Sequence, residues 1–87
     1  MTKAEQFEQL WQMLMPDIAA PDRQQFLLWA GTYSDDQVSR GINRAGIKVR
    51  KLRGTPGAMT ANEAARYATS VMRNEALGIQ QHAPGTR

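Results

Sequence analysis

The basic side chains between Ser39 and Gly54 are the residues of this sequence best suited to a binding function. The stretch SRGINRAGIKVRKLRG holds six Lys or Arg side chains and no acid. Clustered bases neutralise phosphates, and guanidinium groups can bind them through two donors at once. We therefore expect an anion-binding surface here. Its expected residues are Arg40, Arg44, Ile47, Lys48, Arg50, Lys51 and Arg53, with Arg66 and Arg73 extending it on the next helix.

Helical spacing predicts that these bases form a stripe opposite an apolar face, because successive side chains turn by about 100°. The stripe contains Arg40, Arg44, Lys48 and Lys51, with Ile47 exposed among them and Arg50 and Arg53 beside it. The opposite face contains Val38, Ile42, Ala45, Val49 and Leu52. Along the axis the stripe extends roughly 16 Å, which can follow several phosphates of a strand.

Two other interpretations of the stripe stay open. Residues 1–36 hold two bases and six acids, a net charge of −4, whereas residues 37–87 hold nine bases and two acids, a net charge of +7. The bases could therefore pair with the acidic half of the same chain or of a second copy. They could also be a solvated helix face, although Arg40, Arg44 and Lys48 repel one another at i, i+4 spacing by a few tenths of a kcal/mol each.

The other polar residues favour neither an enzyme nor a metal site. There is no Cys, and the single His, His82, has no second ligand at metal spacing. Asp35 and Asp36 follow Ser34 at a helix start, where acids stabilise the helix dipole. The loop RGTPGAM lacks the pattern of a phosphate-binding loop. We expect no catalytic residues, no cofactor, no metal and no small-molecule substrate.

Four helices and no strands are predicted, at about residues 2–15, 21–33, 35–52 and 61–77. Capping boxes begin the first, third and fourth, in TKAE, SDDQ and TANE. Pro21 is expected in the first turn of the second helix. The fold class is thus an all-α compact bundle, with a single helical domain at 1–79 and a disordered tail at 80–87.

Aromatic residues are expected to form the core of this bundle. Trp11 lies on the apolar face of the first helix, and the second presents Phe26, Leu27, Trp29, Ala30 and Tyr33. Trp11, Trp29 and Tyr67 favour core packing over base stacking, because large aromatic side chains usually bury. The N-terminus, MTKAEQFEQLWQM, has no unbroken apolar run, so we expect a cytoplasmic protein without a membrane partner.

Two segments resemble a known family: FLLWAGTYSDDQVSRGINRAGIK and YATSVMRNEALGI. A Trp-containing helix, a turn, a helix of the form V..GI..A and a closing helix are similar to the C-terminal helical domain of DnaD-type primosomal replication proteins, over about residues 26–79. The family's closing motif is Tyr-x-x-x-Ile-x-x-x-Trp, implicated in DNA binding and helicase loading. Tyr67 and Val71 match it, but Glu75 occupies the Trp position. The resemblance implies a replication role.

Three functions follow from these observations. The first is a non-enzymatic nucleic-acid-binding module, such as a plasmid, phage or bacterial DNA replication accessory factor, with single- or double-stranded DNA as partner. The second is a helical protein-protein interaction adaptor or homodimer that sets the acidic half against a basic surface. The third is a helix-turn-helix regulator built from Asp22–Tyr33 and Asp35–Leu52.

Overall fold

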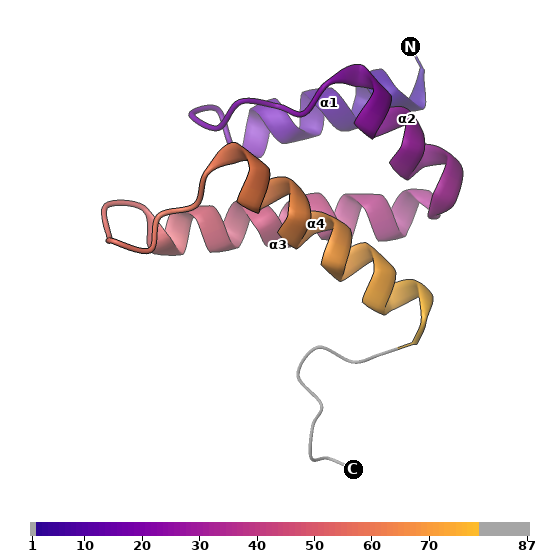
Figure 1. Cartoon of the computed structure of the whole chain (residues 1–87). Coiled ribbons are helices and arrows are strands. Elements are labelled where there is room, and N and C mark those ends of the chain that lie inside the picture. Colours follow the sequence, from indigo (N-terminus) through magenta and orange to yellow (C-terminus); the bar gives the residue numbers. More distant parts are fainter. Residues whose placement is uncertain (1, 79–87) are drawn as a thin grey trace.

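Four α-helices make up the part of the chain that the computed structural model describes, residues 2–78, and this part contains no strand (Figure 1). The helices are α1 (Lys3–Leu14), α2 (Arg23–Thr32), α3 (Asp35–Leu52) and α4 (Ala61–Ala76). The all-α bundle expected from the sequence is confirmed. The tail predicted at 80–87 lies outside the described residues.

Side-chain caps fix where each helix begins. The three predicted capping boxes are all present: Thr2 with Glu5, Ser34 with Gln37, and Thr60 with Glu63. Helix α2 begins later than predicted, because the extended Asp22 is its N-cap and accepts a hydrogen bond from the Gln25 amide. Pro21 therefore precedes the helix and does not lie in its first turn.

Three aromatic rings join α1 to α2 at the centre of the core. Trp11, Phe26 and Trp29 are all buried, as predicted. The Phe26 ring meets the Trp29 ring edge to face, with 5.5 Å between centroids, and the Trp11 ring stacks on Trp29 at 6.3 Å. Each indole N–H has a partner inside the protein: Trp11 donates to the Ile18 carbonyl, and Trp29 donates to the Thr69 hydroxyl of α4.

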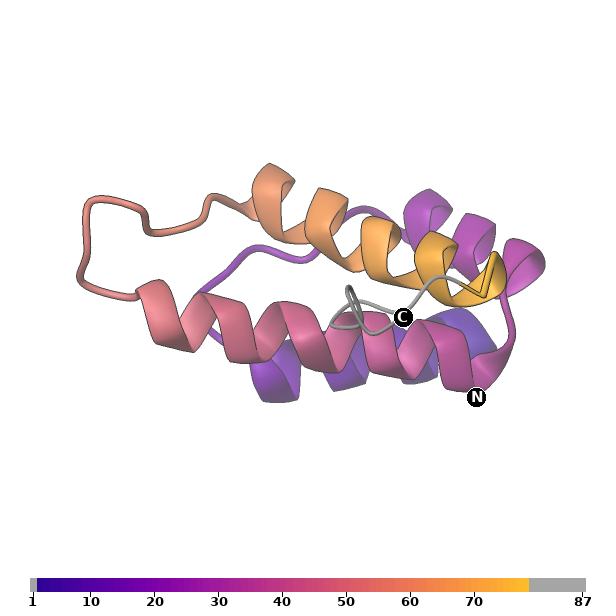
Figure 2. The same ribbon diagram turned by 90° about the horizontal axis from the view of Figure 1, so that it is seen from below.

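Helix α3 is the centre of the bundle and contacts the other three helices, most extensively α4, which runs beside it in both ribbon views (Figures 1 and 2). Val38, Ile42, Ala45 and Val49 are buried as predicted, and Leu52 is half-buried. Gly41 allows the close approach of α4, since a Cβ there would lie 2.8 Å from the Ala68 carbonyl oxygen.

The outer surface of α2 differs from the prediction. Leu27, expected on the apolar surface of this helix, is 54% exposed, and Leu28 is 62% exposed. A ten-residue helix packed on one side buries only the residues that face the core, and Leu27 points away from both Phe26 and Trp29 by about 100° or more. Among the four helices of residues 2–78, none combines the length and apolar character needed to cross a membrane.

Candidate nucleic-acid interface

Ion pairing within the chain divides the basic side chains into two groups. Of the ten bases among residues 2–78, four form ion pairs: Lys3 with Asp35, Arg23 with Glu5 and Glu8, Arg40 with Glu75, and Arg53 with Asp17. The other six have no acidic partner among the described residues. These six are Arg44, Lys48, Arg50, Lys51, Arg66 and Arg73.

The acidic side chains are almost all engaged inside the chain. Seven of the eight acids in the sequence hold an ion pair or cap a helix: Glu5, Glu8, Asp17, Asp22, Asp35, Glu63 and Glu75. Only Asp36 has no such partner among the described residues. The excess positive charge of the described residues is therefore carried by Lys and Arg side chains without an acidic partner, while few acids are left to receive a basic partner.

Three of the unpaired bases surround a surface pocket between α3 and α4, which we call the α3–α4 pocket. It is lined by Arg44, Ile47, Lys48, Lys51 and Tyr67, and its volume is about 380 Å³. Lys48 places its Nζ 5.6 Å from the centroid of the Tyr67 ring, a cation–π contact. Ile47 is 57% exposed beside them. Positively charged side chains thus surround a small apolar and aromatic surface.

Acids neutralise two arginines of the predicted surface: one begins the stripe, and the other lies beside its far end. At one end, Arg40 Nε donates to Glu75 Oε1 at 2.8 Å; at the other, Arg53 Nη2 donates to Asp17 Oδ1 at 2.8 Å. The Asp17–Arg53 pair is an instance of the pairing between the acidic and basic halves that the charge distribution allowed. The Arg40–Glu75 pair gives the half-buried Glu75 a partner. Arg40 lies one helical turn before Arg44, whereas Arg53 lines a different pocket beside the end of α1, and neither of them lines the α3–α4 pocket.

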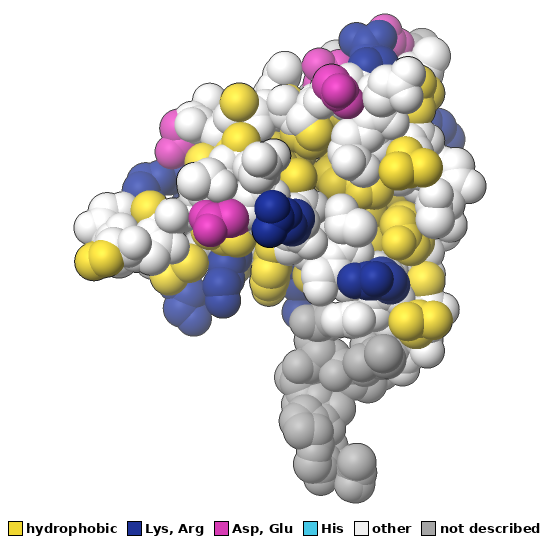
Figure 3. Space-filling view, in the orientation of Figure 1, with side chains coloured by type: hydrophobic (Ala, Val, Ile, Leu, Met, Phe, Trp, Pro, Cys, Tyr) yellow, Lys and Arg dark blue, Asp and Glu magenta, His cyan; other side chains and the backbone are white. Residues whose placement is uncertain are grey.

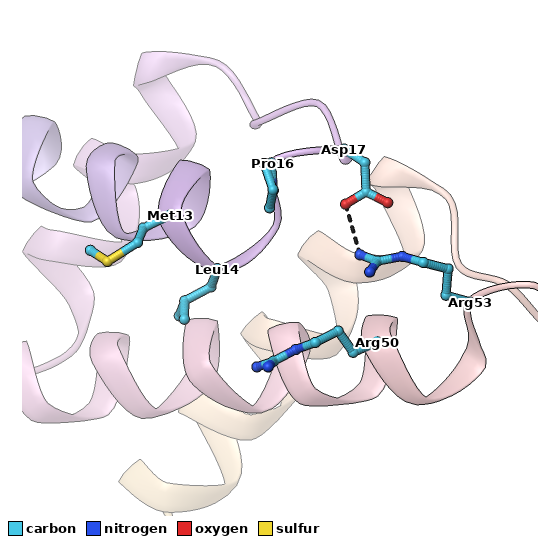
Figure 4. Close-up of a pocket in the computed structure, with 6 residues that line it drawn as sticks. All are labelled: Met13, Leu14, Pro16, Asp17, Arg50 and Arg53. Atoms are coloured by element: carbon cyan, nitrogen blue, oxygen red, sulfur yellow. Dashed lines mark hydrogen bonds and ion pairs between the residues drawn. The ribbon is translucent and has the colours of Figure 1, made fainter.

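Arg50 faces a different part of the surface from the α3–α4 pocket. It lines a pocket of about 640 Å³ between the end of α1 and α3, together with Met13, Leu14 and Pro16 and the Asp17–Arg53 ion pair (Figure 4). The Arg50 guanidinium extends along α3 beneath Leu14 in this view. Arg50 therefore belongs to the basic helix but does not join the other unpaired bases of α3.

Arg66 and Arg73 also lie apart from the α3 stripe. They line a groove between α2 and α4 of about 400 Å³, which we call the α2–α4 groove, with Gln25, Thr69 and Ser70. On α4 they are turned by about 100° or more from Tyr67, the residue that faces α3. The extension of the stripe onto α4 is thus not one continuous patch: the bases occupy two surfaces.

The sequence did not identify Tyr67 as part of the interface, because its contact with Lys48 depends on how α4 packs on α3. Trp11 and Trp29, the other aromatic residues considered for base stacking, are buried and so cannot contact a nucleobase. His82 lies outside the described residues. Within residues 2–78, no three side chains of the His, Cys, Asp or Glu type come together to hold a metal ion.

The capping box at the start of α1 shifts the pKa of Glu5. The hydrogen bond from the Thr2 backbone amide, and then that from its hydroxyl, lowers the pKa of Glu5 below its usual value. This shift reports the capping box of α1 and does not point to catalysis. No protein-family model, curated protein or solved structure matches the chain.

Proposed function

We propose that this protein is a non-enzymatic nucleic-acid-binding module that uses the α3–α4 pocket. The proposal rests on three basic side chains without an acidic partner, Arg44, Lys48 and Lys51. They are arranged around the exposed Ile47 and the Tyr67 ring. The Lys and Arg side chains can bind phosphates, and the apolar and aromatic side chains between them can pack against the faces of nucleobases.

Single strands fit this arrangement better than duplexes. A duplex presents phosphates but hides the faces of its bases, so Ile47 and Tyr67 would gain nothing from it. A single strand exposes its bases, which can stack on an aromatic side chain next to backbone-binding cations. Asn43, at the margin of the stripe, is the amide side chain nearest to it in sequence, so we expect weak discrimination between bases.

The test is a fluorescence anisotropy titration with purified single-stranded and double-stranded oligonucleotides, of DNA and RNA, at two salt concentrations. We expect tighter binding to single strands and a steep loss of affinity as salt rises. Arg44→Gln with Lys48→Gln should reduce the salt slope by about 1.4 on single strands, since each phosphate contact contributes about 0.7. The matched control is Arg66→Gln with Arg73→Gln, which removes the same charge from the α2–α4 groove.

The outcomes separate the candidate functions. If the wild-type protein binds no oligonucleotide at low salt, the proposal fails and the protein-interaction adaptor replaces it. If it prefers duplexes of one sequence, the helix-turn-helix interpretation, with α2 and α3 as the pair, replaces the single-strand one. A role in plasmid, phage or bacterial DNA replication rests on the resemblance to DnaD-type proteins, and DNA binding would be its first experimental support.

A further inference from the structure

The α2–α4 groove combines free cations with exposed leucines. Arg66 and Arg73 line it and are both exposed, with no acidic partner among the described residues. They are seven residues apart on α4, so they lie on the same helix face about 10 Å from each other along the axis. Ser70 lies between them on that face.

Two leucines border the groove residues. Leu77 is 67% exposed and follows Arg73 by four residues, which places it on the same face of α4. Leu28 is 62% exposed and follows the groove residue Gln25 by three residues on α2. Figure 3 shows this side of the molecule, with basic side chains on α4 and apolar side chains beside them over α2 and the end of α4.

We propose that the α2–α4 groove is a docking site for an acidic amphipathic helix of another protein. The partner's carboxylates would pair with Arg66 and Arg73, and its apolar side chains would cover Leu28 and Leu77. Leucine side chains offer no flat ring for a base to stack on, so this surface fits apolar side chains better than it fits nucleic acid.

A second copy of the chain is poorly suited to supply this partner. Its acidic side chains are held by its own bases and helix caps, with Asp36 the single exception among the described residues. Donating them to another copy would break those contacts. The charge complementarity of the groove therefore points to a different acidic protein, and the site is separate from the α3–α4 pocket used for nucleic acid.

Trp29 provides a reporter for docking. Its indole N–H donates to the hydroxyl of Thr69, which lines the groove, at 3.0 Å, so an occupied groove should shift the indole NMR signal. The other tryptophan is an internal control, because the Trp11 indole donates to the Ile18 carbonyl, away from the groove. The pair of indole signals thus distinguishes docking in the groove from binding elsewhere.

The probe is a synthetic helical peptide with Leu at every third and fourth position and Glu between them, compared with a scrambled peptide of the same composition. We expect the helical peptide to bind and to shift the Trp29 indole signal but not that of Trp11. Arg66→Glu with Arg73→Glu should weaken peptide binding about tenfold or more, and so should Leu28→Ser with Leu77→Ser. Arg44→Glu with Lys48→Glu, which changes the net charge equally, should weaken it far less.

Three results would overturn the proposal: no peptide binding, equal binding of the scrambled peptide, or equal losses from the two charge-reversed variants. All four substituted groove residues are exposed, so thermal melting should confirm that each variant stays folded. Nucleic-acid binding is measured separately, by titration with oligonucleotides. If Arg66→Glu with Arg73→Glu abolished oligonucleotide binding and left peptide binding intact, the groove would be part of the nucleic-acid interface.

Discussion

Arg40 of α3 and Glu75 of α4 form an ion pair across the end of the α3–α4 hairpin that lies opposite its connecting loop, with 2.8 Å between Nε and Oε1. The Glu75 side chain is 23% exposed and the Arg40 side chain is 49% exposed. A pair this accessible contributes roughly 0–1 kcal/mol to stability. Its larger effect is on charge, because Glu75 neutralises a base that would otherwise extend the α3–α4 pocket.

Glu75→Gln should therefore strengthen nucleic-acid binding. The substitution keeps the side-chain size and frees Arg40, so we expect a higher affinity for single-stranded oligonucleotides and a salt slope larger by about 0.7. Stability should fall by less than about 1 kcal/mol in thermal melting. The matched control is Glu8→Gln, which adds the same charge near Arg23 on the far side of the core. Equal gains in affinity from both variants would mean that only the net charge matters.

Local signals in the sequence predicted the helices and most of the core. The capping boxes at Thr2, Ser34 and Thr60 involve residues only three positions apart, so a linear pattern contains all of their chemistry. The apolar face of α3 follows from helical spacing alone. The sequence does not determine the first residue of α2, because either Pro21 or Asp22 is compatible with the helix boundary.

The composition of the candidate site could be predicted less well, since it depends on contacts between helices. Two arginines of the predicted surface are neutralised by acids more than 30 residues away in the sequence: Arg40 by Glu75, and Arg53 by Asp17. Helical spacing could show that Arg66 and Tyr67 face different directions. It could not show that Tyr67 would meet Lys48, because that requires the orientation of α4 on α3.

Gly41→Ala should destabilise the fold although alanine favours helices. A Cβ at this position would lie 2.7 Å from Met72 Cγ and 2.8 Å from the Ala68 carbonyl oxygen, so α3 and α4 would have to separate. Overpacking of this kind costs about 1–3 kcal/mol, which exceeds the gain of about 1 kcal/mol in helix propensity. Gly31→Ala is the control, since nothing lies within 4 Å of its added Cβ. Chemical denaturation should show that Gly31→Ala is neutral or stabilising; similar losses for both would contradict the packing argument.

Ser34→Ala and Thr60→Ala should each lower the free energy of unfolding by about 1 kcal/mol. Each hydroxyl accepts a hydrogen bond from a backbone amide at N3, Gln37 for Ser34 and Glu63 for Thr60, which would otherwise lack a partner within the helix. Ser39→Ala, in the interior of α3, removes a hydroxyl with no capping role and is the control. Equal melting of all three variants and the wild type would show that the caps do not stabilise these helices.

Glu5 should make stability sensitive to acid. Its pKa is lowered in the folded protein, first by the Thr2 amide hydrogen bond, so the unfolded chain takes up the proton at higher pH than the folded one. The stabilisation is therefore present above the unfolded pKa and is lost as pH falls through the folded pKa. Glu5→Gln keeps an amide oxygen for the capping box but does not titrate. Melting curves across the acidic range should show a smaller pH dependence for this variant, and an unchanged profile would exclude Glu5 as a source.

Tyr67 should contribute to single-strand binding through its ring and not through its hydroxyl. The ring lies beside Ile47 in the α3–α4 pocket and under the Lys48 ammonium, and no hydrogen bond from its hydroxyl is present among the described contacts. Tyr67→Phe should therefore bind single strands like the wild type. Tyr67→Leu keeps an apolar side chain but loses the aromatic face. Its binding free energy for single strands should therefore weaken by about 1–3 kcal/mol, the contribution of one stacked nucleobase.

Duplex binding separates this role from a structural one. If the ring only supported the position of Lys48, Tyr67→Leu would weaken single-stranded and double-stranded binding by the same factor, because both depend on that cation. If the ring stacks on a base, the loss should be confined to single strands, whose bases are accessible. Parallel anisotropy titrations of both variants on both substrates decide the matter, and an equal loss on the two substrates would reduce the pocket to a purely electrostatic phosphate site.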